Sequence, residues 1–471
     1  MDYKKENVDK DTIMTNSTTN IKKSLVKLNL AYQGNTLRYL KQLKNWQWLD
    51  KDQSDALQHQ ANKRLVIHAY NHVPYYRKVF ESAGVVTASG SVNLEYFSKI
   101  PLLDKAKIRS NFEDLKSDDL HMRKWNKNSS GGSTGEPVTL IQDNVYADWK
   151  GAVKILYDSW TECSIAGKKI CLWGSERDIF MGRETSKTRL MQWLNNHVWL
   201  NAFRMTPDEM HSYVRTINDV KPVQILSYVE SIFDLSRFIE REGLSVYSPR
   251  SIMTTAGPLS QHIRDTVGRV FKAPLFNRYG SREVGDMACE CDAHTGLHVS
   301  LPTHYVEVLR SDGTPTDPGE VGQIVITCLS NYAMPLIRYC IGDMGKWADH
   351  SCSCGRSWPL LKEIVGRETD IFLKDDGSRI HGEYFTHLFY YQDWVEKFQV
   401  VQEDYQNLCV KIVPREQCIN PLELYAQHIE EISDKMKLVM GQKCNVNFEF
   451  LDDIVPTASG KYRYTISMID R

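Results

Sequence analysis

The middle of the chain alternates short apolar runs with amphipathic stretches, and this pattern limits the folds that the chain can adopt. Four apolar runs are typical of buried strands: Lys169–Trp173, Val223–Ser227, Ser251–Thr255 and Pro274–Arg278. Two stretches with helical periodicity lie between them, Pro207–Asn218 and Ser231–Gly243, and Thr206 is a typical N-cap for the first. Because strands that alternate with helices build α/β sheets, we expect an α/β fold.

The two ends of the chain differ from this region. Residues 1–23 are polar and lack the apolar core of a signal peptide, which predicts a disordered tail. Near the other end, Lys397–Gln402 and Leu408–Val413 indicate a hairpin, and Val446–Phe450 indicates a closing strand. One helix face is expected between them, formed by Leu422, Tyr425, Ile429, Ile432, Met436 and Val439. The boundaries predicted are therefore 24–366 for a large N-terminal α/β domain with central sheets and 367–471 for a small α+β domain.

Composition excludes several classes of protein. The 471 residues carry a formal net charge of −1, so no global basic field favours nucleic acid or an anionic membrane. No apolar run reaches the roughly 18 residues of a spanning helix. We therefore expect a cytoplasmic protein whose 11 cysteines stay reduced, with no nucleic acid or membrane partner.

Residues 129–137 read SSGGSTGEP, a stretch that suits neither a helix nor the interior of a strand. Its glycines allow close backbone approach, and its hydroxyl groups add donors, which favours a loop that wraps an anion such as a phosphate chain. The strand-like run Val138–Ile141 follows, whereas the P-loop and the Rossmann turn both lead into a helix. A flexible surface linker is the alternative reading of this stretch alone.

Four further short motifs follow the loop in order along the chain. They are Tyr279-Gly280-Ser281-Arg282-Glu283, Arg338–Asp343, Gly366-Arg367 and Pro456–Lys461. Each is weak by itself, since a Tyr-Gly turn or a solvated lysine is common. Five motifs in a fixed order at these separations are not a plausible coincidence.

With these motifs the sequence resembles the adenylate-forming enzymes, which include acyl-CoA ligases, luciferases and peptide-synthetase adenylation domains. The segments His68–Gly84 and Leu102–Lys105 and the CSCGR run most resemble the phenylacetate-CoA ligase and CapK-like branch. The resemblance implies ATP-dependent activation of a small carboxylic acid to an acyl-adenylate, with release of pyrophosphate. The acyl group would then pass to the thiol of CoA or to the phosphopantetheine of an acyl carrier protein. It also implies that the C-terminal domain is a mobile lid.

The resemblance implies a role for each motif. The loop residues Ser130, Gly132, Ser133, Thr134 and Gly135 would hold the β- and γ-phosphates of ATP. Glu283 would bind Mg²⁺, a hard ion that suits a carboxylate, and Gly280 and Ser281 would contact the nucleotide. Tyr279 would stack near the adenine, Asp343 would accept from the ribose hydroxyls, and Arg367 would contact ribose or phosphate. Lys461 on the lid would bridge the attacking carboxylate and the α-phosphate.

The sequence departs from the family pattern in two places. Glu136 stands where the family loop often has lysine, and Gly131 stands where it often has a hydroxyl. The usual hinge Gly-Arg-x-Asp-Asp reads Gly366-Arg367-Glu368-Thr369-Asp370, so the pivot is Thr369 or Asp370. Because the loop has no lysine of its own, the positive charge at the reacting centre must come from Mg²⁺ and from Lys461.

Four cysteine and histidine residues match a metal arrangement of the family, namely Cys291, His298, Cys352 and Cys354. Three thiolates and one imidazole form a closed tetrahedral set, so the resemblance implies a structural Zn²⁺. Four reduced cysteines and a surface histidine are the alternative.

The acyl pocket is expected between about Trp173 and Gly257, with Tyr228, Glu230, Ala256 and Gly257 as candidates by resemblance. Three functions stay open: a two-step ligase that forms a thioester, an adenylating enzyme with an amine or hydroxyl acceptor, and a non-catalytic binding protein. The retained Thr134, Glu283, Asp343 and Lys461 argue against the third. The identity of the acid and the existence of a homodimer are left open.

Overall fold

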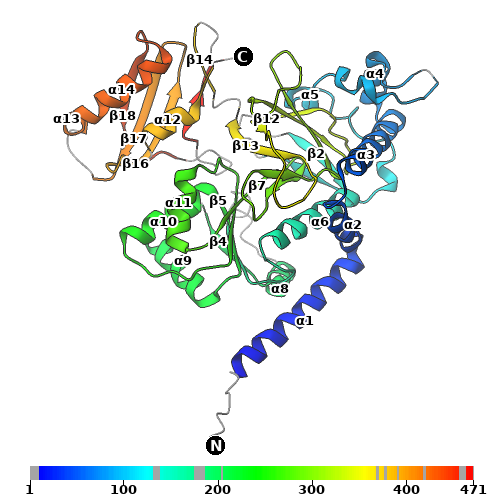
Figure 1. Ribbon diagram of the computed structural model, residues 1–471, viewed down its shortest axis with the longest axis horizontal. Coiled ribbons are helices and arrows are strands. Elements are labelled where there is room, and N and C mark those ends of the chain that lie inside the picture. Colours follow the sequence, from blue (N-terminus) through cyan, green and yellow to red (C-terminus); the bar gives the residue numbers. More distant parts are fainter. Residues whose placement is uncertain are drawn as a thin grey trace, which may run out of the picture.

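The computed structural model describes residues 10–87, 89–130, 138–173, 186–202, 205–367, 371–375, 379–389, 392–416, 421–455 and 463–469. An 11-stranded sheet forms the centre of the large domain, in the order β10-β11-β12-β13-β9-β8-β7-β6-β5-β3-β4 (Figure 1). In that order the strands are His304–Leu309, Gly322–Cys328, Tyr339–Trp347, Leu360–Arg367, Leu297–Val299, Gly285–Glu290, Leu275–Ser281, Ser251–Thr255, Gln224–Tyr228, Lys169–Trp173 and His197–Asn201.

The sheet has a parallel half and an antiparallel half that meet at β7. Strands β4, β3, β5, β6 and β7 pair in parallel, whereas β7 pairs with β8 antiparallel, as do the strands beyond it. Parallel neighbours need long crossovers, and α8 (Ser186–Asn195), α9 (Pro207–Val220), α10 (Val229–Arg241) and α11 (Gln261–Phe271) supply them. The expected α/β alternation is therefore confirmed over this half, including the N-cap of α9, where Thr206 accepts from the Glu209 amide.

The helices from the first part of the chain include α2, which packs against α6, and α6, which contacts β8, whereas α1 projects from the body of the large domain (Figure 1). They are α1 (Lys10–Gln33), α2 (Thr36–Trp46), α3 (Lys51–His72), α4 (Pro74–Ala83), α5 (Lys105–Ser110) and α6 (Asn144–Trp160), with short 3₁₀ turns η1 (Leu94–Lys99) and η2 (Leu120–Met122). The predicted disordered tail over residues 1–23 needs correction from Lys10 onward, because α1 begins there and contacts α8 and α2. The polar composition of that stretch concealed the helix.

The C-terminal domain is a four-stranded sheet in the order β18-β17-β16-β19, covered by helices. Its elements are β14 (Ile371–Leu373), β15 (Arg379–His381), α12 (Gly382–Phe389), β16 (Val395–Gln402), β17 (Asn407–Pro414), α13 (Pro421–Leu424), α14 (Ala426–Met440), β18 (Asn445–Phe450) and β19 (Thr465–Ser467). The predicted hairpin and closing strand are present, but the single predicted helix is divided. Leu422 lies on α13 and is 54% exposed, whereas Ile432 and Met436 of α14 are buried.

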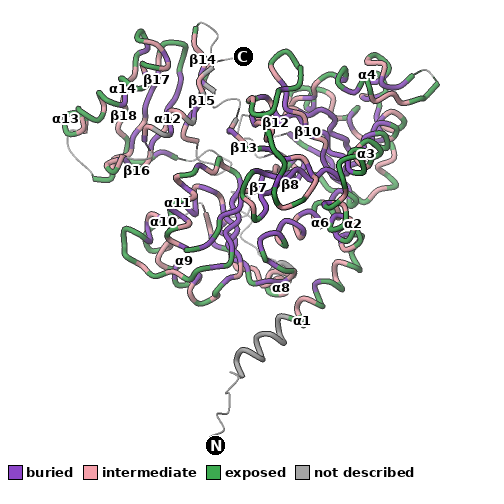
Figure 2. Tube along the Cα trace, in the orientation of Figure 1, coloured by how far each residue is buried: buried purple, intermediate pink, exposed green. Residues whose placement is uncertain are grey.

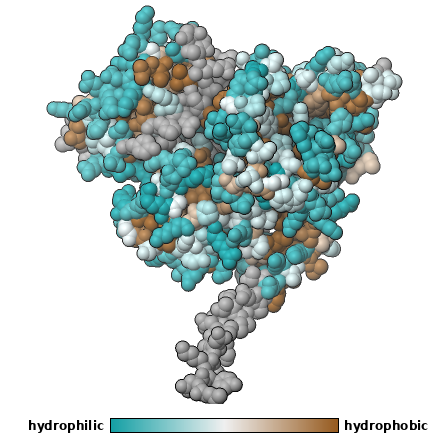
Figure 3. Space-filling model, in the orientation of Figure 1, coloured by the Kyte–Doolittle hydropathy of each residue, from teal (hydrophilic) through white to brown (hydrophobic). Residues whose placement is uncertain are grey.

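Burial follows these layers, since the strands of the large sheet and the inner faces of its helices are buried (Figure 2). On the face shown in Figure 3, hydrophilic side chains predominate and hydrophobic ones lie scattered among them. Among the described residues, no helix combines the length and the apolar character that crossing a membrane requires.

Candidate active site

The strands on either side of the glycine-rich stretch, β1 (Trp125–Ser129) and β2 (Thr139–Asp143), pair antiparallel as a hairpin. Ser130 closes this loop at its base, because its amide donates to the Val138 carbonyl (2.9 Å) and its Oγ accepts from the Val138 amide (2.9 Å). Ser130 is buried there, so it contributes to the shape of the loop base. The other predicted phosphate ligands, Gly132, Ser133, Thr134 and Gly135, lie outside the described residues.

The hairpin is fastened to the turn that carries Glu283. Asn128 of β1 and Gln142 of β2 both donate to the Arg282 carbonyl (3.0 Å each), and Gln142 also donates to the Glu283 carbonyl (3.1 Å). Gln142 is 5% exposed, so its amide group has little access to solvent and bonds to these carbonyls instead. Three hydrogen bonds therefore tie the hairpin to the turn that carries Glu283.

The turn itself requires its glycine. A Cβ atom on Gly280 would lie 2.9 Å from both Asp286 Oδ1 and the Gly285 carbonyl, too close for any larger residue. Within the turn, the Ser281 hydroxyl accepts from the Val284 amide (3.3 Å). Glu283 is 9% exposed, so its carboxylate lies at the edge of the interior beside the loop hairpin.

Tyr279 and Asp343 lie side by side, although they are far apart in the sequence. The Tyr279 hydroxyl donates to Asp343 Oδ2 at 2.7 Å. Asp343 on β12 is in turn the register partner of Arg367 on β13. The backbone thus brings three predicted nucleotide residues together, although nothing is described of the Arg367 side chain.

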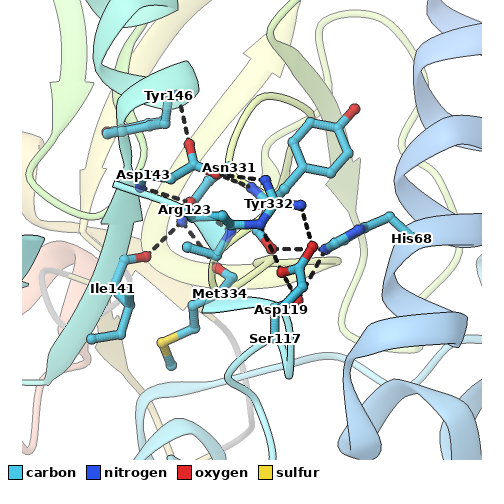
Figure 4. Close-up of polar contacts among 11 residues, drawn as sticks. His68, Ser117, Asp119, Arg123, Ile141, Asp143, Tyr146, Asn331, Tyr332 and Met334 are labelled. Carbon is cyan, nitrogen blue, oxygen red and sulfur yellow. Dashed lines mark hydrogen bonds and ion pairs between the residues drawn. The ribbon is translucent and has the colours of Figure 1, made fainter. Parts of the chain in front are cut away.

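A network of charged residues supports the base of the hairpin (Figure 4). Arg123, directly before β1, donates two hydrogen bonds to Asp119 (2.6 and 2.7 Å) and one to Asp143 (3.3 Å) at the end of β2. Asp143 also caps α6 by accepting from the Tyr146 amide (2.8 Å). Asn331 donates to the backbone of β2 (2.9 Å). These contacts fix where the loop hairpin leaves the domain, and none of them was predicted from the sequence.

The predicted acyl-pocket residues follow the carboxyl ends of two parallel strands, the usual place for a ligand in such sheets. The Tyr228 ring at the end of β5 lies against the Trp173 ring, with centroids 4.3 Å apart. A Cβ atom on Gly257 would lie 3.6 Å from Glu230 Oε1, so these two residues are adjacent. Ala256 adopts a left-handed conformation (φ 68°), which bends the chain after β6.

Glu230 also contacts the C-terminal domain, because its carboxylate accepts a hydrogen bond from the Tyr464 hydroxyl. Burial raises the pKa of Glu230 to about 8, and the Tyr464 hydrogen bond opposes that increase. A carboxyl group that joins the two domains was not predicted from the sequence. The catalytic candidate Lys461 lies outside the described residues, as do the hinge candidates Thr369 and Asp370.

Four side chains converge in what we call the thiol cluster: Cys291, His298, Cys352 and Cys354. Their ligand atoms all lie within 4.8 Å of one another. Cys291 Sγ and Cys352 Sγ are 3.6 Å apart, and Cys354 Sγ is 3.3 Å from His298 Nε2. His298 Nδ1 lies 3.2 Å from the Trp358 carbonyl, which orients Nε2 toward the sulfurs. The predicted ligands are thus brought together.

Comparison with known proteins identifies relatives of this chain. A family model described as the CapK C-terminal domain matches residues 372–468. Protein CapK of Staphylococcus aureus is 21% identical over 423 residues, which cover 88% of this chain and 89% of CapK. A phenylacetate-coenzyme A ligase of Thermus thermophilus is 26% identical over 339 residues, 69% of this chain and 73% of that ligase. The chain is homologous to CapK and to the phenylacetate-CoA ligases.

Solved structures show the same fold. A 2-hydroxyisobutyryl-CoA ligase in the postadenylation state has a TM-score of 0.67 at 18% identity, covering 89% of this chain and 90% of that one. ATP-bound MatB from Rhodopseudomonas palustris has a TM-score of 0.51 at 12% identity, covering 72% and 66%. The chain therefore has the fold of the adenylate-forming ligases, and its relatives support an AMP-forming ligase.

Proposed function

We propose that the protein activates a small carboxylic acid with ATP, forming an acyl-adenylate and pyrophosphate, and then transfers the acyl group to the thiol of CoA. The hydrogen bond from Tyr279 to Asp343 carries this proposal, because it joins two of the motifs into one nucleotide site. The fastening of the loop hairpin to the Glu283 turn supports it, since that contact would keep the phosphates beside the metal ligand.

The chemistry explains why these residue types are needed. A carboxylate oxygen attacks the α-phosphorus of ATP, and the bond to pyrophosphate breaks, so two anions must approach each other. Lys461 would offset that charge, and Thr134 would donate to the departing phosphates. Glu283 offers a hard carboxylate donor beside the loop base, which fits Mg²⁺. The Mg²⁺ ion would supply further positive charge.

We also propose that the thiol cluster holds a structural Zn²⁺. Zinc–sulfur bonds of about 2.3 Å in a tetrahedron place two sulfurs roughly 3.8 Å apart. The 3.6 Å between Cys291 Sγ and Cys352 Sγ fits that sulfur–sulfur separation. The 3.3 Å between Cys354 Sγ and His298 Nε2 is shorter, as expected where the smaller nitrogen replaces a sulfur. Four protein ligands leave no open position, so this metal would join β9 to the segment before β13 and take no part in the reaction.

An ATP–pyrophosphate exchange screen over aryl, alkyl and amino acids tests the first half-reaction. We expect exchange with at least one acid and loss of about 100-fold or more in Lys461→Ala, because the substitution removes charge stabilisation at the reacting centre. Lys443→Ala is the matched control, since Lys443 is an exposed lysine of the same domain. Unchanged exchange by Lys461→Ala with every acid would contradict the mechanism.

The acceptor is tested separately. Pyrophosphate release is measured with and without CoA, and a CoA-dependent increase is expected for a thioester-forming ligase. Release that CoA does not stimulate would instead favour the phosphopantetheine of a carrier protein, an amine or a hydroxyl as the acceptor.

A further inference from the structure

Two polar contacts join described residues of the C-terminal domain to α10 of the large domain, and Figure 1 shows the arrangement of the two domains. The Tyr464 hydroxyl donates to the carboxylate of Glu230 in the first turn of α10. Arg237 Nη1 donates to the Glu396 carbonyl on β16 at 3.3 Å. Glu230 and Arg237 are two turns apart on one face of α10, so both contacts with the C-terminal domain come from the same helix face.

Tyr464 is held firmly within its own domain. Its ring stacks on Phe398, with centroids 4.8 Å apart. Its carbonyl accepts from the Val400 amide at 2.7 Å, and Gln399 donates to the neighbouring Arg463 carbonyl at 2.8 Å. The chain then continues as β19, parallel to β16. The position of the Tyr464 hydroxyl therefore reports the position of the whole C-terminal domain.

The contact lies close in sequence to Lys461, the lysine proposed for the reacting centre. Lys461 precedes Tyr464 by three positions, and an extended chain spans at most about 3.6 Å per residue, so their Cα atoms lie within roughly 11 Å. Glu230, in turn, is adjacent to Gly257 at the predicted acyl pocket. The hydrogen bond thus places Tyr464, three positions after Lys461 in the sequence, beside the residues where the acid is expected to bind.

We propose that Tyr464 is a positioning residue for adenylate formation: its hydrogen bond to Glu230 holds the C-terminal domain where Lys461 reaches the reacting carboxylate. The inference rests on the proposed function and adds a residue that is not among the five motifs. Tyr464 touches neither ATP nor the acid in this role; it acts through the placement of its domain. The bond must break whenever the lid moves away for the second half-reaction.

Tyr464→Phe tests the proposal, because it keeps the ring on Phe398 and removes only the hydroxyl. Tyr384→Phe is the matched control, since the Tyr384 hydroxyl donates to the Lys435 carbonyl within the C-terminal domain (2.8 Å). The assay is ATP–pyrophosphate exchange with Mg²⁺ and the acid that the wild type uses best. We expect kcat to fall about tenfold in Tyr464→Phe, the upper end of the usual scale for a lost side-chain hydrogen bond.

Two further readouts separate positioning from simple destabilisation. The KM for ATP should stay within about twofold, because Tyr279, Asp343 and Glu283 all belong to the large domain. Both tyrosine variants should melt at the wild-type temperature. Hydrogen–deuterium exchange of the α10 peptide, measured without substrates, should rise in Tyr464→Phe and not in Tyr384→Phe.

The other possible results would each overturn the positioning role, the proposed function or the domain contact. Wild-type kcat in Tyr464→Phe overturns the positioning role and leaves the proposed function standing. An equal loss of kcat in both variants, or a lowered melting temperature in Tyr464→Phe alone, assigns the residue a merely structural role. If the wild type exchanges with no acid, the proposed function fails, and unchanged α10 protection in Tyr464→Phe then overturns the domain contact as well.

Discussion

Among the described residues of the large domain, two clusters could hold a metal by distance alone, and they differ in what else their atoms contact. One is the thiol cluster. The other, which we call the carboxylate cluster, consists of His68, His72 and Asp119. In the carboxylate cluster Asp119 is already paired with Arg123, and His68 Nε2 lies 2.8 Å from the Tyr332 carbonyl. His72 Nδ1 pairs with Asp118 at 2.8 Å.

The thiol cluster has contacts of another kind. Thr295 donates to Cys352 Sγ (3.5 Å), and the Arg356 amide donates to Cys354 Sγ (3.4 Å). Such bonds to sulfur stabilise a thiolate and leave it able to bind a metal, whereas a guanidinium that covers a carboxylate replaces the metal. Proximity of the ligand atoms alone therefore does not identify a metal site. The other contacts of each atom decide whether the cluster needs a metal ion.

Cys352→Ser should produce the largest effect. We expect the bound zinc, about one per chain, to be lost, and the free energy of unfolding to fall by about 5 kcal/mol, because the metal joins segments far apart in the sequence. Metal content by mass spectrometry and thermal unfolding measure both. Cys340→Ser is the control, since it makes the same change at a half-buried cysteine outside the thiol cluster. A fully stable wild type without metal would refute the zinc assignment.

Arg123→Met should come next, with a loss of about 3 kcal/mol in denaturant unfolding. The substitution leaves Asp143, whose side chain is 2% exposed, without its charge partner. Arg250→Met is the control: Arg250 pairs with Glu162 at 3.5 Å, both side chains are mostly exposed, and about 0.5 kcal/mol or less is expected. If Arg123→Met lowered the free energy of unfolding no more than the control does, the guanidinium of Arg123 would not be needed to stabilise the carboxylates around it.

The contact of Arg123 with Asp119 predicts a dependence on pH. The hydrogen bonds from Arg123 hold the pKa of Asp119 well below the usual range. The stabilisation is therefore complete above the unfolded-state pKa of about 3.9 and disappears as the pH falls through the folded-state value. The stability difference between wild type and Arg123→Met should accordingly shrink in acid. A difference that stayed constant from neutral pH to about pH 2 would contradict this account.

The contrast also separates what the sequence could predict from what it could not. The alternation around α9 and α10 was predictable from periodicity, and the members of the thiol cluster were predictable from the resemblance to the family. Arg123 and Asp143 were not, since single charged residues have no pattern and their partners are distant in the chain. Gln142 left a weak signal, as a polar residue inside an apolar strand. Tyr464 left none, because its role depends on how two domains meet.

His72→Gln should have the smallest effect and is the sharpest test of the contrast. Its side chain is 41% exposed, stacks on His68 and pairs with a largely exposed Asp118, so we expect a stability change within about 0.5 kcal/mol and unaltered zinc content. His298→Gln, the same change in the thiol cluster, should lose the metal, because an amide replaces the imidazole that faces Cys354. Loss of zinc from His72→Gln would mean that the carboxylate cluster binds the ion after all. The guanidinium of Arg123 would then be no substitute for a metal, and the distinction drawn between the two clusters would fail.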